Sequence, residues 1–155
     1  MKTLVKMLSV LIILLPTLLH AEGNLEIDMD KFLTAKKALV KETLQLTEKE
    51  STVFWPLYEE YQEAKLIIFN RHVALIREHM QVRGNLSDKK AEAMINEYII
   101  VQSVDLKFKQ SFVKIFRKNF PYRRLYHFFD LEDSIEIGFF AGIAEDLPIV
   151  DEISK

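Results

Sequence analysis

Two long stretches without a helix-breaking residue constrain this chain more than any other feature of its sequence. The 155 residues include only four glycines and four prolines, and none lies between Pro56 and Gly84 or between Gly84 and Pro121. Apolar residues in both stretches recur at intervals of three and four, which is the spacing of an amphipathic helix. No stretch shows the sustained alternation of a strand. The sequence therefore predicts an all-α fold with four helices, arranged as elongated helical hairpins.

Capping residues and prolines place these four helices along the chain. Thr47 and Glu50 have the spacing of a capping box at the start of the second helix, and Ser87 can cap the third. Pro56 lies beyond the first turn of the second helix, so it should bend that helix or restart it. Pro121 suits the first position of the fourth helix. We expect helices over residues 30–45, 48–83, 88–119 and 121–146.

The first 21 residues have the three parts of a secretory signal. Lys2 and Lys6 give a positive start, residues 7–15 are almost wholly apolar, and Ala21 is a small residue at the expected cleavage position. A transmembrane span needs about 20 continuous apolar residues, and Lys6 and Pro16 interrupt the run too soon. We therefore expect cleavage after Ala21 and export to the periplasm as a soluble protein.

The chain that remains after cleavage should form one helical domain over residues 30–148, with a flexible start over 22–29 and a flexible tail over 149–155. Loss of Lys2 and Lys6 from the 21 basic residues leaves 19 against 23 acidic ones, a net charge of −4. A mildly acidic exported protein is a poor candidate for nucleic-acid binding. The chain has no cysteine, which excludes disulfides and the attachment of lipid to a cysteine.

Enzyme motifs are missing from the sequence, which has no cysteine nucleophile, no G-x-S-x-G, no H-E-x-x-H and no glycine-rich phosphate loop. We therefore expect a non-enzymatic protein without a cofactor. His72 and His79 lie seven residues apart on the second helix, about 10 Å along its axis, too far apart to hold one metal ion together. With a second element they could sense metal or pH. Core histidines with hydrogen-bond partners are the simpler interpretation, and we predict no metal site.

Charged and polar side chains interrupt the apolar faces of three helices. Lys65 falls beside the two histidines, Gln102 and the i,i+4 pair of Asp105 and Lys109 are central on the third helix, and Glu132 lies among apolar residues of the fourth. Burying a lone charge is costly, so these groups should pair with one another. In the simplest arrangement, Glu132 pairs with a basic residue of the second or third helix. We predict a buried polar layer of His72, His79, Asp105, Lys109 and Glu132.

The third helix has an unusually wide apolar face. Its apolar residues cover about 220° of the circumference, against about 100° for an ordinary surface helix. Either several helices surround it or part of it meets another chain, and an exposed remainder would be a binding surface. Residues 107–124 include seven basic and no acidic residues, whereas residues 130–152 include eight acidic and no basic ones. The basic block could contact acidic clients, or it could be a solvated face that pairs with the acidic helix.

Short motifs give the chain a resemblance to a known family. Leu46-Thr47-Glu48-Lys49-Glu50 resembles the L-T-x-x-Q signature of the Spy/CpxP-like periplasmic proteins, and residues 86–90 look like a second, degenerate copy. Glu50 and Lys90 replace the final Gln of the signature. The run Phe54-Trp55-Pro56-Leu57-Tyr58-Glu59-Glu60-Tyr61 is similar to the F-W-P-x-Y-x-x-Y run of related exported proteins. The resemblance covers most of residues 35–150.

The resemblance implies a hairpin-based protein that dimerises and acts as an ATP-independent chaperone or as an accessory protein of the envelope stress response. On this interpretation, unfolded or envelope proteins bind to the third helix through Ile99, Leu106, Phe108, Lys107 and Lys114. Two other function classes stay open. The chain could be a dedicated subunit or regulator of one envelope partner, such as a sensor kinase, or it could be a metal- or pH-responsive sensor.

Overall fold

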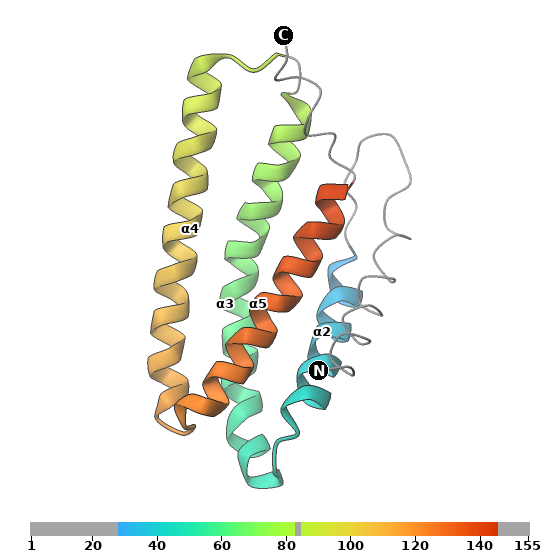
Figure 1. The fold of residues 1–155 in the computed structure, drawn as a ribbon, viewed down its shortest axis with the longest axis vertical. Helices are drawn as coiled ribbons and strands as arrows, with labels where there is room; N and C mark the ends of the chain where they lie inside the picture. The colour runs from blue at the N-terminus through green and yellow to red at the C-terminus, as the bar shows by residue number, and fades with distance from the viewer. Residues whose placement is uncertain (1–27, 83–84, 146–155) are drawn as a thin grey trace. The chain divides into compact units, whose positions relative to one another are not determined.

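The computed structural model describes residues 28–82 and 85–145, which form four α-helices (Figure 1). The helices are α2 (Met29–Leu44), α3 (Glu48–Gln81), α4 (Asp88–Arg117) and α5 (Tyr122–Glu145). No strand occurs in these ranges, so the prediction of an all-α fold with four helices is confirmed. The predicted signal over residues 1–21, most of the predicted flexible start and the predicted tail lie outside the described residues and stay predictions.

The starts of α3 and α4 follow from their capping residues. The Thr47 hydroxyl accepts a hydrogen bond from the Glu50 backbone amide at 3.2 Å, and the Glu50 carboxylate accepts one from the Thr47 amide at 2.9 Å. This reciprocal pair is a complete capping box. The Ser87 hydroxyl accepts a bond from the Lys90 amide at 3.3 Å. Because a lysine side chain cannot accept a hydrogen bond, Lys90 leaves the second box half formed.

Several details of the helices differ from the prediction. α3 continues without a break through Pro56, so the alternative of a restart is wrong. α4 ends at Arg117 instead of Asn119, because the amides of residues 118–119 bond to carbonyls three residues back, in a tighter turn. Pro121 lies one residue before α5, where its carbonyl accepts bonds from the amides three and four residues further on. The proline therefore precedes the helix instead of taking its first position.

α2 ends in a left-handed turn at Gln45, whose φ and ψ are 45° and 52°. Glycine is the usual residue at such a helix end, because its lack of a Cβ atom removes the clash with the backbone. A glutamine there costs about 1 kcal/mol in conformational energy. The turn nevertheless ends α2, and three residues separate this helix from α3.

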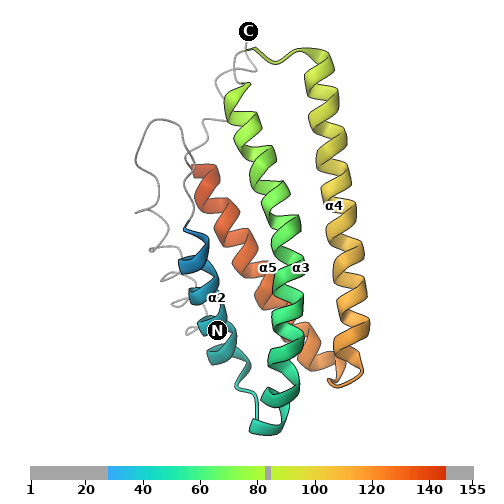
Figure 2. The same cartoon turned by 180° about the vertical axis from the view of Figure 1, so that it is seen from behind.

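The chain divides into two compact units. Unit 1 combines the chain up to Leu46 with the chain from Tyr126 onward, so its described part contains α2 and most of α5. In this unit the rings of Phe32 and Phe139 lie 4.8 Å apart. Unit 2 covers Thr47–Leu125 and contains α3, α4 and the first turn of α5. Both views show α3 and α4 side by side and antiparallel (Figures 1 and 2).

Aromatic side chains form the core of unit 2 near the start of α3 and the end of α4. The rings of Phe54 and Phe116 lie 5.7 Å apart, and those of Tyr61 and Phe112 lie 5.3 Å apart in an edge contact. All four side chains are buried. Trp55 is only partly buried and makes an edge contact with Phe54 at 5.2 Å. These aromatic pairs pack the two helices together over several turns.

Candidate functional site

Exposed apolar side chains gather on α4. Ile99 is 57 % exposed and Leu106 is 58 % exposed. The exposed large apolar residues of this helix are Ile95, Tyr98, Ile99, Ile100, Val104 and Leu106. A helix at a protein surface usually turns one apolar stripe to the core and polar residues to water. α4 departs from this pattern, because it shows apolar side chains to solvent in addition to those that it buries.

Helix geometry explains why α3 does not cover these residues. The buried side chains of α4, which include Val101, Phe112 and Phe116, lie on one side of the helix. At 100° per residue, Ile95, Ile99 and Leu106 lie about 110° around the axis from that side. Ile100 and Val104 lie about as far around in the other direction. The wide apolar face of α4 is therefore partly buried and partly exposed.

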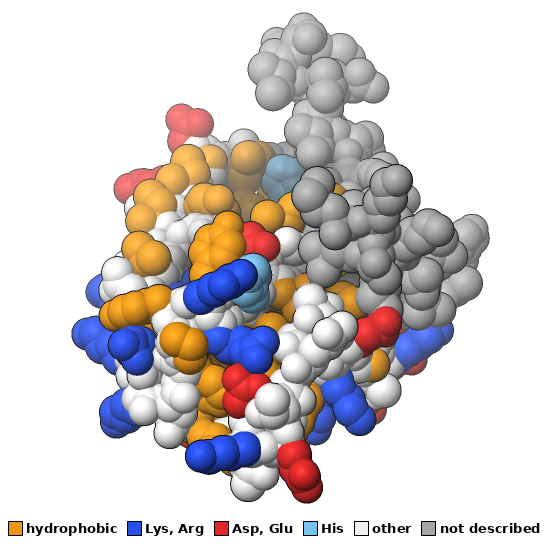
Figure 3. All heavy atoms as spheres, turned by 60° about the horizontal axis from the view of Figure 1, so that its bottom comes forward, with side chains coloured by type: hydrophobic (Ala, Val, Ile, Leu, Met, Phe, Trp, Pro, Cys, Tyr) orange, Lys and Arg blue, Asp and Glu red, His pale blue; other side chains and the backbone are white. Residues whose placement is uncertain are grey.

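Basic side chains lie close to the exposed apolar ones. Lys107 and Lys114, predicted to bind clients, are exposed on α4. Figure 3 turns the end of the molecule where α4 finishes toward the viewer and shows Lys and Arg side chains next to apolar ones. Phe108 does not belong to this exposed group. Its ring is partly buried, 5.1 Å from the ring of Tyr61 and 4.8 Å from that of Phe112, so it packs α4 against α3.

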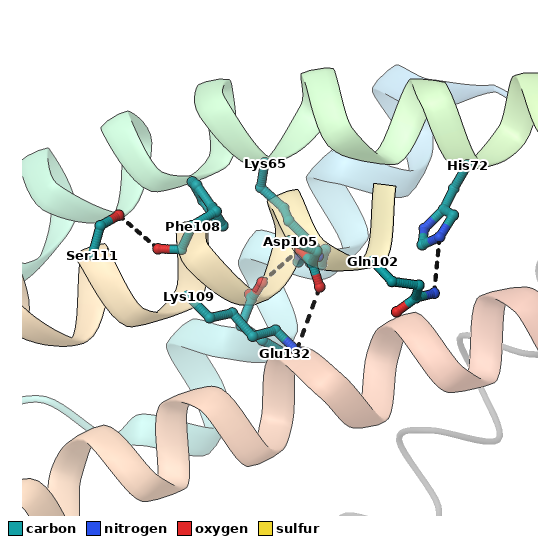
Figure 4. A network of polar contacts seen from close by, with 9 residues as sticks. Lys65, His72, Gln102, Asp105, Phe108, Lys109, Ser111 and Glu132 are labelled. Carbon is teal, nitrogen blue, oxygen red and sulfur yellow. Dashed lines mark hydrogen bonds and ion pairs between the residues drawn. The ribbon is translucent and has the colours of Figure 1, made fainter. Parts of the chain in front are cut away.

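A charged cluster connects α3 and α4 halfway along their contact (Figure 4). The Lys65 ammonium lies 2.5 Å from Oδ1 of Asp105, and these side chains are only 6 % and 12 % exposed. The other carboxylate oxygen of Asp105 lies 3.8 Å from the Lys109 ammonium. Further along, the side-chain amide nitrogen of Gln102 lies 3.1 Å from Nε2 of His72. These polar contacts fix the register of α4 on α3, because a slip would bury a charge without its partner.

The predicted polar layer is only partly present. Asp105 and Lys109 lie in the cluster with Lys65, and His72 is half-buried. His79 is exposed, so its place in a buried layer is wrong, because the end of α3 leaves this side chain in water. No group of three His, Cys, Asp or Glu residues that could hold a metal ion occurs in residues 28–82 and 85–145.

A second buried ion pair lies in unit 1. Glu132 contacts the Lys36 ammonium at 2.8 Å, and these side chains are 2 % and 8 % exposed. The sequence analysis did not single out Lys36. The signal was present, because Lys36 lies four residues from both Phe32 and Val40 and so falls on the apolar face of α2. Lys65 was singled out as a charged residue on an apolar helix face, and the same reasoning applies to Lys36.

Residues of the family motifs have capping and packing roles. Besides completing the capping box, the Glu50 carboxylate accepts hydrogen bonds from the Arg124 guanidinium at 3.0 and 3.1 Å. The backbone amide of Thr47, followed by Arg124, holds the pKa of Glu50 below its ordinary value. Tyr58 is buried beside Phe54, with ring centroids 5.7 Å apart. The remaining motif positions differ in burial: Tyr61 is buried, Leu46 half-buried and Pro56 exposed.

Comparison of the chain with known proteins finds no match. It matches no family model, no curated protein and no solved structure. No helix within the described ranges is long and apolar enough to cross a membrane. Inference about function therefore depends on the surfaces and contacts of the chain itself.

Proposed function

We propose that the chain is an exported, non-enzymatic protein that holds apolar segments of unfolded or envelope proteins on α4 without using ATP. The exposed apolar side chains of α4 carry this proposal. Apolar side chains that gather on the surface of a protein mark sites of binding to other molecules. Six large apolar side chains are exposed within the twelve residues from Ile95 to Leu106.

The packing beneath this surface supports a role in binding. Asp105 and Lys65 hold α4 to α3 through a buried ion pair, and Phe112 and Phe116 pack the same side of α4 against Tyr61. α4 can therefore display its exposed side chains without rearranging its own core. A surface that is already in its binding conformation pays less conformational entropy when a client is bound.

Charge near the surface supports reversible binding of many clients. Residues 107–124 include no acidic residue, and Lys107, which directly follows Leu106, and Lys114 are exposed. Exposed basic groups increase the rate of encounter with acidic segments and add little to the lifetime of the complex. Fast and weak capture of unfolded chains is the behaviour expected of a holding chaperone.

The resemblance to Spy/CpxP-like proteins agrees with this function. α3 and α4 are 34 and 30 residues long, which suits the long hairpin that the resemblance implies. The residues similar to the L-T-x-x-Q signature begin α3 through the capping box of Thr47 and Glu50. The motif residues thus begin α3, the helix against which α4 packs. Clients would bind to α4 and not to the motif.

Light scattering from a chemically unfolded client that aggregates on dilution tests the proposal. The protein purified after export should suppress scattering at near-equal molar amounts without ATP. Ile99→Asp should abolish most of this effect, because it places a charge among the exposed apolar side chains of α4. Ile67→Asp on α3 is the matched control, since Ile67 is 68 % exposed and lies outside that surface. Circular dichroism checks that both variants remain helical.

Two outcomes would count against the proposal. If scattering is unchanged even at severalfold excess of the protein, the chain is no general chaperone, and a dedicated envelope partner becomes the better explanation. If the Ile99→Asp and Ile67→Asp variants suppress aggregation equally well, clients bind to a surface other than α4.

A further inference from the structure

Exposed basic side chains gather where α4 ends and α5 begins. The exposed basic residues of this region are Lys114, Arg117, Lys118 and Arg123. Tyr122, the first residue of α5, lies among them in the sequence and is 66 % exposed. We call these five residues the basic corner. All of them belong to unit 2, and Figure 3, which turns this end toward the viewer, shows Lys and Arg side chains on it.

The positive charge of the basic corner is not neutralised by the described part of the chain. The neighbouring Arg124 pairs with Glu50, but no ion pair in residues 28–82 and 85–145 includes a basic residue of the corner. On the acidic helix α5, Glu132 pairs instead with Lys36 of α2. The charge of the corner is therefore available to another molecule.

Two contacts hold Arg117 in place within the basic corner. Its guanidinium donates a hydrogen bond from Nη1 to the Phe120 carbonyl at 3.4 Å and lies over the ring of Tyr122, 4.7 Å from the centroid. A guanidinium has five N–H groups, so this one bond leaves others for the oxygen atoms of a phosphate. The corner thus presents a fixed guanidinium, a tyrosine ring and three further cations in its binding conformation.

We infer that the basic corner docks this protein on a membrane surface that contains anionic phospholipids. Clusters of four to eight Lys and Arg residues bind such surfaces through the phosphates of the headgroups. An exposed tyrosine beside them is typical of a membrane interface, where the ring lies at the level of the headgroups. The whole chain has a net charge of −2, and salt screens charges beyond about 8 Å. Attraction therefore acts at the corner alone and brings that end of the α3–α4 hairpin to the surface.

This inference does not depend on the proposed function. Leu106, the last of the exposed large apolar residues of α4, lies about 12 Å along the helix axis from Lys114. Docking through the basic corner leaves these apolar side chains open to clients. Lys118→Gln should weaken membrane binding and leave the suppression of aggregation unchanged, and Ile99→Asp should have the opposite effects. Failure of one proposal is therefore distinguishable from failure of the other.

Sedimentation with vesicles tests the docking. The exported protein should bind phosphatidylcholine vesicles that contain about 30 % phosphatidylglycerol and should not bind vesicles of phosphatidylcholine alone. Lys118→Gln and Arg123→Gln should each lower the partition coefficient about fivefold, and together about 25-fold, because each cation near an anionic surface contributes by about that factor. Lys89→Gln is the matched control. Lys89 is exposed at the other end of α4, about 40 Å along the axis from Lys118, and its substitution should have less than a twofold effect.

Salt separates docking by charge from insertion of apolar side chains. Raising the salt concentration from about 0.1 M to about 1 M shortens the screening length from about 10 Å to about 3 Å and should release the protein from the vesicles. Binding that persists at the higher concentration would overturn the inference, as would equal effects of Lys118→Gln and Lys89→Gln. Absence of binding to the anionic vesicles would also overturn it. If soluble polyglutamate then binds and Lys118→Gln weakens that binding, the basic corner is a site for acidic proteins instead.

Discussion

Asp105→Ala should lower the free energy of unfolding by about 3 kcal/mol. Removing one member of a buried ion pair costs about 3–5 kcal/mol, because the charge left behind loses its partner. Lys65, 2.5 Å from the carboxylate, is almost fully buried, so its ammonium bears this penalty. Lys109 lies further away at 3.8 Å, and its side chain is 25 % exposed. When the Asp105 carboxylate is removed, the Lys109 ammonium can turn to water and so adds little to the loss. The expected loss of free energy therefore lies at the lower end of the range.

Two further variants separate the ion pair from general packing. Lys65→Met keeps the apolar stem and leaves Asp105 beside Lys109, so we expect a loss of only about 1–2 kcal/mol. Combining Lys65→Met with Asp105→Leu replaces both charges by apolar groups, and such replacements are often close to neutral. The free energy of unfolding of the double variant should lie within about 1 kcal/mol of that of the wild type.

Urea unfolding followed by tryptophan fluorescence measures these changes. Trp55 is the chain's one tryptophan and lies on α3 next to Phe54, so its emission reports on unit 2. An Asp105→Ala variant within about 0.5 kcal/mol of the wild type would show that the pair is not effectively buried. The double variant could instead lose as much free energy of unfolding as Asp105→Ala and Lys65→Met lose together. That result would show that size and shape, and not charge, determine the stability of this cluster.

Three other predictions follow from the described contacts and from the sequence. The pKa of Glu50 is lowered in the folded state by Thr47 and Arg124, so its stabilising effect is present above the ordinary glutamate value of about 4.3 and lost as pH falls through the lower folded value. Glu50→Gln should therefore reduce the dependence of the melting temperature on pH in this acidic range, and an unchanged dependence would contradict the assignment. Gln45→Gly should raise the free energy of urea unfolding by about 0.5–1 kcal/mol, because glycine adopts the left-handed turn without a clash; a decrease would contradict this. Export from a bacterial host should remove residues 1–21, and an intact mass equal to that of the full chain would refute cleavage.

Local signals in the sequence predicted the fold better than they predicted the surfaces. The capping residues Thr47 and Ser87 gave the starts of α3 and α4, since an N-cap acts within one turn. The end of α4 was predicted two residues too late, because the hydrogen bonding of the chain before Pro121 changes gradually over residues 118–120. Helix ends without a glycine cap lack a comparably sharp signal.

Contacts between distant residues were harder to predict. The width of the apolar face left open whether several helices surround α4 or part of it meets another chain, and the position of α3 decides which side chains are exposed. Ile99 and Leu106 are exposed, while Phe108 packs against Tyr61. The sequence likewise showed Glu132 on an apolar face and could not name Lys36 as its partner, since one sequence without aligned relatives does not record which helices meet.

The affinity of the protein for an unfolded apolar peptide tests the central claim most directly. A fluorescently labelled peptide that does not fold alone can be titrated with the wild type, Leu106→Asp and Ile67→Asp, and its anisotropy measured. The wild type and Ile67→Asp should bind equally. Leu106→Asp should bind about tenfold more weakly, because a charge replaces an apolar side chain that the bound peptide would cover. Equal binding by all three proteins, or no binding by any of them, would contradict the claim that α4 holds clients on its exposed apolar side chains.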